Sequence, residues 1–310
     1  MFLKTKNSTV QQIRFSEIDK YDISLSIKRE DQLHPFISGN KYRKLKYNLA
    51  EAFQQNKSSL LTFGGAFSNH IAATAAAGFE HGFNTIGVIR GDELATNLKE
   101  VLETNPTLKF ASEHNMQFYF VTRSDYRNKT TPQFIKTLED KFGDFYLVPE
   151  GGTNHFAVKG CEEILSEDDK QYDIICSSVG TGGTISGLIN SAKTHQKVIG
   201  FPALKGDFLK NEIKPYVRNM DNWSLNTNYH FGGYAKISEE LITFINKFKN
   251  ETNIPLDPIY TGKMLFGIVD LIKNGYFKKG TKILVIHTGG LQGIEGMNIL
   301  LKKKNLPQIL

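Results

Sequence analysis

The chain has 310 residues, of which 40% are hydrophobic and 23% are charged, and this composition excludes a disordered or fibrous protein. The formal net charge of +6 comes from scattered lysines and from a run, Lys302 to Lys304, that suits a solvated helix end, so we expect no nucleic-acid partner. The two cysteines, Cys161 and Cys176, lack zinc spacing and a disulfide framework, which favours a reducing compartment and no metal. Without a secretory signal or a long apolar run, we expect a cytoplasmic protein with no membrane partner.

Strand and helix patterns alternate along the chain. Short apolar or β-branched runs predict strands that begin at Ser59, Phe83, Phe118, Phe145, Tyr172, Lys197 and Lys282. Helical patterns lie between these runs, and this alternation predicts an α/β protein with parallel sheets built from right-handed βαβ units. The clearest break follows Pro149, at Glu150-Gly151-Gly152, so we expect a domain boundary there and one site shared by two α/β layers.

The first candidate for chemistry is Lys41, in the turn Ser38-Gly39-Asn40-Lys41. A lone lysine is normally a surface charge. A lysine in a chain that also binds an anionic cofactor is a candidate for carbonyl chemistry.

The segment from Gly64 to His70 joins a predicted strand to an alanine-rich helix. Ser68 and Asn69 fall at the helix start, where side chains and free N–H groups bind carboxylates. The alternative is simple capping by Ser68 or Asn69, with His70 at the surface. No metalloprotease, paired-carboxylate or nucleophile-elbow motif accompanies this histidine.

A second glycine-rich junction consists of Gly180, Thr181, Gly182, Gly183 and Thr184. It has neither the dinucleotide fingerprint, because Ile185 stands where the last glycine is needed, nor a P-loop lysine. Glycines and a helix start of this kind form a cradle for a single phosphate. The alternative is a tight turn that packs a helix on a sheet.

Four residues of the C-terminal half complete the pattern. Tyr260 and Thr261 precede a helical stretch, and Tyr234 follows two glycines, although each tyrosine has the alternative of a core position. Thr288 ends the last strand, where open α/β sheets collect ligands. A phosphate cradle, a lysine and a carboxylate-binding helix start together suggest pyridoxal 5'-phosphate (PLP), held by Lys41 as a Schiff base, with an amino-acid substrate.

The ordered motifs SGNKYRKL, GGAFSNH, GTGGT, YTGK and HTGG resemble those of PLP enzymes of the tryptophan synthase β-chain fold type, known as fold type II. Within that group the chain resembles the branch of D-cysteine desulfhydrase and 1-aminocyclopropane-1-carboxylate deaminase, from about Ser38 to about Gly290. The resemblance implies a homodimer of subunits with two open twisted α/β domains and the active site in the cleft between them. The expected large domain is residues 1–43 and 151–310, and the small domain is residues 44–150.

The resemblance also implies residue roles around the cofactor. Lys41 would carry the Schiff base, Lys44 would contact the phosphate, and the loop from Gly180 to Thr184 would hold it. Asn69 would bond the ring hydroxyl, and Thr261 would lie next to the pyridine nitrogen.

Around the substrate, the residues expected are Ser68, Asn69, His70 and Thr288. Ser68 would meet the carboxylate or assist proton transfer. Tyr234 and Tyr260 would face the substrate as phenols that polarise it or move protons.

Two positions distinguish between the reactions expected in this branch. The resemblance implies glutamate and leucine in cyclopropane-carboxylate deaminases where this chain has Thr261 and Thr288. A threonine leaves the pyridine ring a weaker electron sink, which suits α,β-elimination of D-cysteine to pyruvate, ammonia and sulfide better than ring opening. The alternatives are the deaminase, a β-replacing cysteine synthase, a serine racemase or dehydratase, and a non-catalytic binding module that kept the fold.

Overall fold

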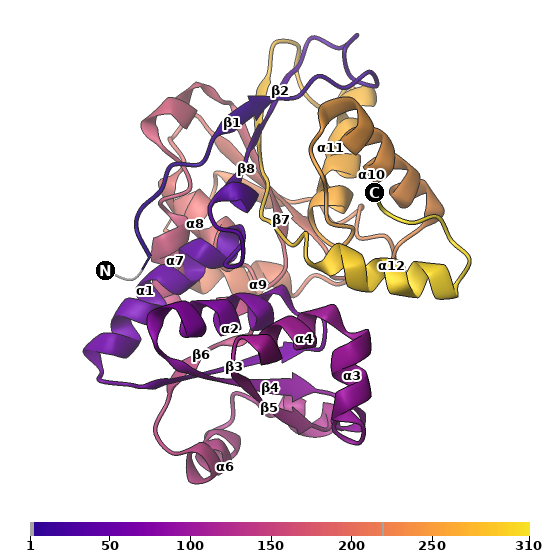
Figure 1. Ribbon diagram of the computed structural model, residues 1–310. Coiled ribbons are helices and arrows are strands. Elements are labelled where there is room, and N and C mark those ends of the chain that lie inside the picture. The colour runs from indigo at the N-terminus through magenta and orange to yellow at the C-terminus, as the bar shows by residue number, and fades with distance from the viewer. Residues whose placement is uncertain (1–2, 219) are drawn as a thin grey trace.

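The computed structural model describes residues 3–218 and 220–310, which form two β-sheets flanked by helices (Figure 1). The larger sheet has the strand order β1-β2-β10-β7-β8-β9, and the smaller has the order β5-β4-β3-β6. Except for the antiparallel pair β1–β2, neighbouring strands are parallel. The predicted α/β architecture with parallel sheets is confirmed.

The strands of the larger sheet are β1 (Val10–Gln12), β2 (Ser24–Lys28), β7 (Ile174–Val179), β8 (Lys197–Pro202), β9 (Trp223–Leu225) and β10 (Lys282–Ile286). Those of the smaller sheet are β3 (Ser59–Gly65), β4 (Asn84–Arg90), β5 (Met116–Val121) and β6 (Tyr146–Val148). Each of the seven predicted strands is present. The sequence patterns missed β1, β2 and β9.

The helices are α1 (Asn40–Gln54), α2 (Asn69–His81), α3 (Leu98–Thr104), α4 (Pro106–Glu113), α5 (Arg123–Arg127), α6 (Pro132–Phe142), α7 (His155–Cys161), α8 (Gly183–Ser191), α9 (Leu209–Ile213), α10 (Glu239–Thr252), α11 (Thr261–Lys273) and α12 (Gly293–Lys303). Between residues 3 and 218 and from 220 onward, no helix combines the length and the apolar character needed to cross a membrane.

Helix α1 connects the two parts of the molecule, because it packs on α7 and α8 beside the larger sheet and on α2 beside the smaller one (Figure 1). Strands β3 to β6 lie within residues 44–150, and the strands of the larger sheet lie outside that range. The expected boundary between residues 43 and 44 falls inside α1, so the two-domain division stays a prediction. Because α1 is continuous across this position, Lys41 and Lys44 lie on the same helix.

Each sheet has its own buried core. The large core packs α10 and α11 on the larger sheet and includes Phe15, Ile27, Phe248, Met264 and Val285. A second core joins α1 to α2 and the smaller sheet, with Leu45, Leu49, Leu60 and Ala76. The alanines of α2 allow close packing, because a small side chain lets helix and sheet approach each other.

Candidate active site

The turn that precedes α1 rests directly on the segment that follows β10. The Asn40 backbone N–H donates to the Thr288 carbonyl over 3.2 Å. Gly39 has φ +60°, and a Cβ atom there would lie 2.0 Å from the same carbonyl oxygen, so the position requires glycine. This contact fixes Lys41, the second residue of α1, beside the carboxyl end of the larger sheet.

Lys41 is half-buried at this edge. Burial holds the pKa of Lys41 well below its ordinary value, and the positive charge of Lys44 lowers this pKa further. More of the amine is therefore in its uncharged form at a given pH, and the uncharged form is the nucleophile in carbonyl chemistry.

Lys44 lies one turn further along α1 and is buried. Its Nζ donates to the Gly151 carbonyl at 2.8 Å and to the hydroxyls of Thr153 and Thr181 at 3.0 and 3.4 Å. Burial lowers the pKa of Lys44 to about 8. Across the described residues no carboxylate pairs with this amine, so its partners are neutral and a phosphate anion would complement it.

The glycine-rich loop stands next to Lys44. Gly182 has φ +85°, in the left-handed region that favours glycine, and a Cβ on Gly183 would lie 2.8 Å from Thr153 Oγ1. The loop opens the nine-residue helix α8, whose first N–H groups have no partner within the helix. Backbone donors, a helix N-terminus and a buried amine at one place fit a phosphate group.

Hydroxyl groups tie this loop to its neighbours. Thr153 Oγ1 and Thr181 Oγ1 are 2.6 Å apart, and the Asn40 side-chain amide donates to Thr184 Oγ1 over 2.8 Å. The turn that carries Lys41 is thus bonded to the loop expected to hold the phosphate. Thr153, which the sequence analysis did not select, directly follows the Glu150-Gly151-Gly152 break, and that proximity was its only signal.

At the start of α2, Ser68 is the helix cap. Its Oγ accepts N–H bonds from His70 at 3.2 Å and from Ile71 at 3.4 Å, so Ser68 caps α2, and its contact with substrate stays a prediction. Both bonds use Ser68 as acceptor, which leaves its hydroxyl proton for another group. Asn69 Oδ1 accepts a 2.8 Å bond from Gln292, just before α12, and therefore connects the two parts of the molecule.

His70 is buried, so the alternative of a surface histidine is wrong. Its Nε2 lies 2.8 Å from Thr62 Oγ1, and Thr62 donates its own proton to the Val148 carbonyl, so Nε2 is the donor. Burial and the nearby lysines hold the pKa of His70 well below its usual value, which keeps the ring neutral. The ring also faces Gly152, where a Cβ would lie 3.0 Å from Cε1. Contact between His70 and substrate stays a prediction.

Tyr234 and Tyr260 face each other across the site, with ring centroids 6.2 Å apart and an interplanar angle of 63°. Burial raises the pKa of both phenols, that of Tyr260 most strongly. The ring of Tyr260 lies against the phosphate loop, since a Cβ on Gly180 would be 3.2 Å from Cε1. Tyr234 is 41% exposed, which rules out its alternative as a core residue.

Thr261 is buried and bonded to a carboxylate that the sequence analysis missed. Its Oγ1 donates to Asp257 Oδ2 over 2.6 Å and accepts the Asp257 N–H at 3.0 Å. Asp257 also accepts the backbone N–H groups of Ile259, Tyr260 and Thr261, and so fixes the turn that leads into α11. The spacing of Asp257, three and four residues before the Tyr260 and Thr261 amides, was the available signal.

Thr288 pairs with another residue that was not predicted. Its Oγ1 lies 3.0 Å from Ser178 Oγ, at the end of the neighbouring strand β7. Both hydroxyls can rotate, so either one can donate while the other accepts. Contact of Thr261 with the pyridine nitrogen and contact of Thr288 with substrate stay predictions.

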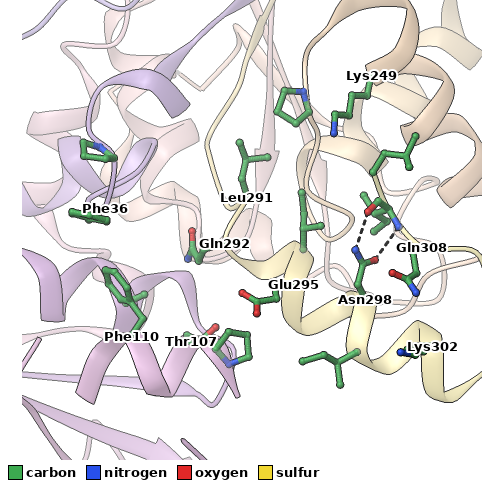
Figure 2. A pocket seen from close by; sticks show the side chains of 18 residues that line it. Phe36, Thr107, Phe110, Lys249, Leu291, Gln292, Glu295, Asn298, Lys302 and Gln308 are labelled. Carbon is green, nitrogen blue, oxygen red and sulfur yellow. Dashed lines mark hydrogen bonds between the residues drawn. The ribbon is translucent and has the colours of Figure 1, made fainter. Parts of the chain in front are cut away.

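A separate groove of about 790 Å³ lies between α4 and α12, with Phe36, Phe110 and Glu295 among its lining residues (Figure 2). Gln292, the partner of Asn69, lines it, but Lys41, Lys44 and the two site tyrosines do not. The groove is therefore distinct from the phosphate cradle.

The fold and the cradle define an α/β enzyme that holds a phosphorylated cofactor beside a reactive lysine. Residues 6–289 match the family described as pyridoxal-phosphate dependent enzymes, and the chain belongs to that family. Its cofactor is therefore PLP, as the sequence analysis predicted.

Individual relatives indicate to which branch of this family the chain is similar. The chain is 31% identical to a putative 1-aminocyclopropane-1-carboxylate deaminase of Pyrococcus furiosus, over 86% of this chain and 84% of that protein. It is 30% identical to the mitochondrial bifunctional D-cysteine desulfhydrase/1-aminocyclopropane-1-carboxylate deaminase of Arabidopsis thaliana, over 87% and 73% of the two chains. A crystal structure described as an ACC deaminase homologue superposes with a TM-score of 0.80 at 27% identity and covers 98% of this chain and 95% of the other. The predicted resemblance to this branch is confirmed.

Proposed function

We propose that this PLP-dependent enzyme converts D-cysteine and water into pyruvate, ammonia and hydrogen sulfide by α,β-elimination. The observation that carries the proposal is the pair Thr261 and Thr288, at the positions where the deaminase resemblance implies glutamate and leucine. The Thr261 hydroxyl is neutral and its proton is already donated to Asp257, so it does not supply the negative charge with which a glutamate would keep the ring nitrogen protonated. A ring that is not held protonated by glutamate withdraws electrons weakly, which is sufficient when thiolate leaves from Cβ.

We assign the cofactor contacts to the cradle. Lys44, the α8 N-terminus and the hydroxyls of Thr181 and Thr184 hold the phosphate, and Asn69 meets the ring hydroxyl. When bound, PLP supplies an aldehyde that condenses with amines and a ring that draws electrons away from the substrate Cα.

Ser68 and α2 orient the substrate in this proposal. Because Ser68 Oγ accepts two helix N–H groups, its proton points outward and can bind the substrate carboxylate. The positive end of the α2 dipole favours the same anion. With the carboxylate fixed there, the Cα–H bond is turned toward one defined side of the site.

Lys41 and the tyrosines then move protons. The Lys41 amine, whose low pKa supplies its uncharged form, accepts the Cα proton at Nζ. Tyr260 and Tyr234 stay protonated because burial raises the pKa of each phenol. A protonated phenol next to the departing sulfur can donate its proton to the thiolate, and the second tyrosine, whose ring lies beside the first, is a candidate to reprotonate it.

Deaminase activity on 1-aminocyclopropane-1-carboxylate is the second candidate, and the relatives that bear that name support it. The purified enzyme should be given D-cysteine, L-cysteine and 1-aminocyclopropane-1-carboxylate in parallel, with sulfide and keto acid measured. We expect D-cysteine to have the highest kcat/KM. Ring opening faster than sulfide release would overturn the choice.

The same assay separates the remaining alternatives. A β-replacing enzyme would form new amino acids when sulfide and O-acetylserine are supplied together. A racemase or dehydratase would convert serine faster than cysteine. A non-catalytic binding module would bind PLP and turn over none of these substrates.

We also propose, from the resemblance, that the protein is a cytoplasmic homodimer. Phe36 and Phe79, which are 49% and 55% exposed, lie with Phe110 and His114 in an aromatic patch that supports a subunit contact. Light scattering should give twice the chain mass of 34.9 kDa. A monomer mass at micromolar concentration would contradict the dimer.

A further inference from the structure

The segment that carries Tyr234, residues 229–236, is docked along one face of α11, and we call it the Tyr234 loop. Its contacts fall on Lys263, Phe266, Gly267 and Asp270, which share a helix face because they are spaced three, four and seven residues apart. The N-cap of the same helix is Tyr260. One helix therefore holds both tyrosines of the site.

The contact nearest to the site is made by Lys263. Its Nζ donates to the His230 carbonyl at 3.0 Å and to the Gly233 carbonyl at 2.8 Å, directly before Tyr234. Lys263 is only 2% exposed, and burial lowers its pKa to about 8 although Asp257 acts in the opposite direction. A buried amine is costly, so these two bonds compensate for its loss of water.

The backbone of the loop needs such an anchor. Phe231 and Ala235 have φ values of +53° and +56°, and Gly232 and Gly233 have +88° and +117°. Non-glycine residues in the left-handed region cost of order 1 kcal/mol or more each and persist only where surrounding contacts hold them. Lys263 binds the His230 carbonyl, which precedes this stretch, and the Gly233 carbonyl within it.

The other contacts are further from Tyr234. The Phe231 and Phe266 rings meet at 5.0 Å, and the Tyr229 hydroxyl donates to Asp270 over 2.7 Å. These contacts keep the far end of the loop on α11. They do not hold the Gly233 carbonyl, so Tyr234 depends on Lys263.

We propose that Lys263 is a positioning residue, whose amine locks the Tyr234 loop onto α11 so that the Tyr234 hydroxyl meets Tyr260. This inference rests on the proposed function for its reaction, in which the two phenols supply the proton to the leaving group. No role was assigned to Lys263 from the sequence.

The first test is hydrogen–deuterium exchange of the loop amides, which needs no substrate. The Gly233 and Lys236 N–H groups donate within the loop, to the His230 and Gly233 carbonyls. In Lys263→Met, which keeps the length of the side chain without its amine, we expect faster exchange over residues 230–236 and unchanged exchange in α8. Unaltered exchange in the loop would overturn the proposal. If Lys263→Met does not fold, Lys263→Leu, which also lacks a hydrogen-bond donor, serves in its place, with the same two results decisive.

The second test is a double-mutant cycle on kcat with the PLP-loaded enzyme. Tyr234→Phe removes the hydroxyl, and we expect a loss of about 10- to 100-fold, at the low end for a proton donor. Lys263→Met should lose a similar factor, and the double variant should lose no more than the larger single loss, because both changes remove one function. Independent, multiplied losses would mean that Lys263 is merely structural.

Tyr229→Phe is the matched control, since it removes the bond to Asp270 at the far end of the loop and should keep kcat within about twofold. A large loss in this control would show that any loosening of the loop suffices, against a special role for Lys263. The two proposals fail separately. If D-cysteine is not a substrate, the exchange result still decides the role of Lys263, and the cycle is run on whichever substrate is turned over.

Discussion

The phosphate cradle and the tyrosine face are built in different ways. In the cradle, Lys44 is buried and its amine is bonded to a carbonyl and two hydroxyls contributed by two other segments. On the tyrosine face, Tyr234 is 41% exposed and belongs to a loop in which four residues have positive φ values. From this difference we expect cofactor binding to depend on fixed backbone and the choice of reaction to depend on a few side-chain hydroxyls. Changes in the two regions should therefore have separable effects.

The largest effect should come from the residue between the two regions. Lys41→Ala removes the amine that we propose both attaches the cofactor and acts as the base, so kcat should fall by about 10²- to 10⁴-fold, and the Schiff-base absorbance should vanish. Lys99→Ala changes an exposed lysine and should leave both unaltered. Retained absorbance in Lys41→Ala would show that another residue attaches PLP.

Within the cradle, Lys44→Met should act on binding and stability in opposite directions. Loss of a charged hydrogen-bond donor should weaken PLP binding by roughly 10- to 100-fold. The cofactor-free protein should keep or gain thermal stability, because a costly buried amine is replaced by an apolar chain. Titration with PLP and thermal unfolding without it measure the two effects. A large loss of stability in the cofactor-free variant would contradict the view of Lys44 as a binding residue.

Cofactor binding should also depend on pH through Lys44. Since its pKa is about 8 in the free protein and an anion raises it, binding takes up a proton above that pH. Affinity for an unreactive phosphate ligand such as pyridoxine 5'-phosphate should be flat near pH 7 and fall as pH rises through about 8. Lys44→Met should abolish this slope, and a slope that persists would assign it to another group.

The same pKa shift has a defined sign for stability. Between about 8 and the ordinary value of 10.5, the unfolded chain holds more protons at this lysine than the folded chain, so its contribution to stability rises with pH. Lys263 has a similarly lowered pKa, so it adds to the rise of stability with pH in the wild type and in Lys44→Met alike. The difference between wild type and Lys44→Met is thus the quantity to measure, by denaturant unfolding at pH 7 and pH 10.

The smallest effect on PLP binding should come from Thr261, whose bond to Asp257 supports the turn that carries Tyr260. Thr261→Val leaves Asp257 without its hydroxyl donor but with its backbone donors, so stability should fall by about 1–3 kcal/mol. Thr261→Ser keeps the hydroxyl and should recover most of that loss. PLP binding should change little in either variant. If Thr261→Val releases PLP instead, the two regions are not separable at this residue.

Local patterns predicted the parallel strands because β3, β4, β7, β8 and β10 are continuous buried runs. They missed β2, whose Ser26 and Lys28 alternate with apolar residues yet are buried. Lys28 is tolerated there because it pairs with Asp169, a partner 141 positions away that no local pattern reveals. β1 and β9 have three residues each, too few for any periodicity.

Some residues of the candidate site could likewise be predicted from local sequence patterns, and others could not. Glycine at positions 39, 182 and 183 reflects close backbone approach, so the motifs that contain these residues could be found in the sequence. The supporting residues Asp257, Ser178 and Lys263 were missed, because their importance lies in hydrogen bonds made only after folding. We predict contact between His70 and substrate because His70 follows Ser68 and Asn69. The bond between its ring and Thr62 could not be predicted, because it joins α2 to β3 only after folding.

The central claim is that threonine at positions 261 and 288 directs the cofactor toward elimination. The most direct test is the ratio of kcat/KM for sulfide release from D-cysteine to kcat/KM for 2-oxobutanoate formation from 1-aminocyclopropane-1-carboxylate, on one preparation of the PLP-loaded enzyme. We expect a ratio well above one. A ratio below one would contradict it and assign the enzyme to ring-opening deamination.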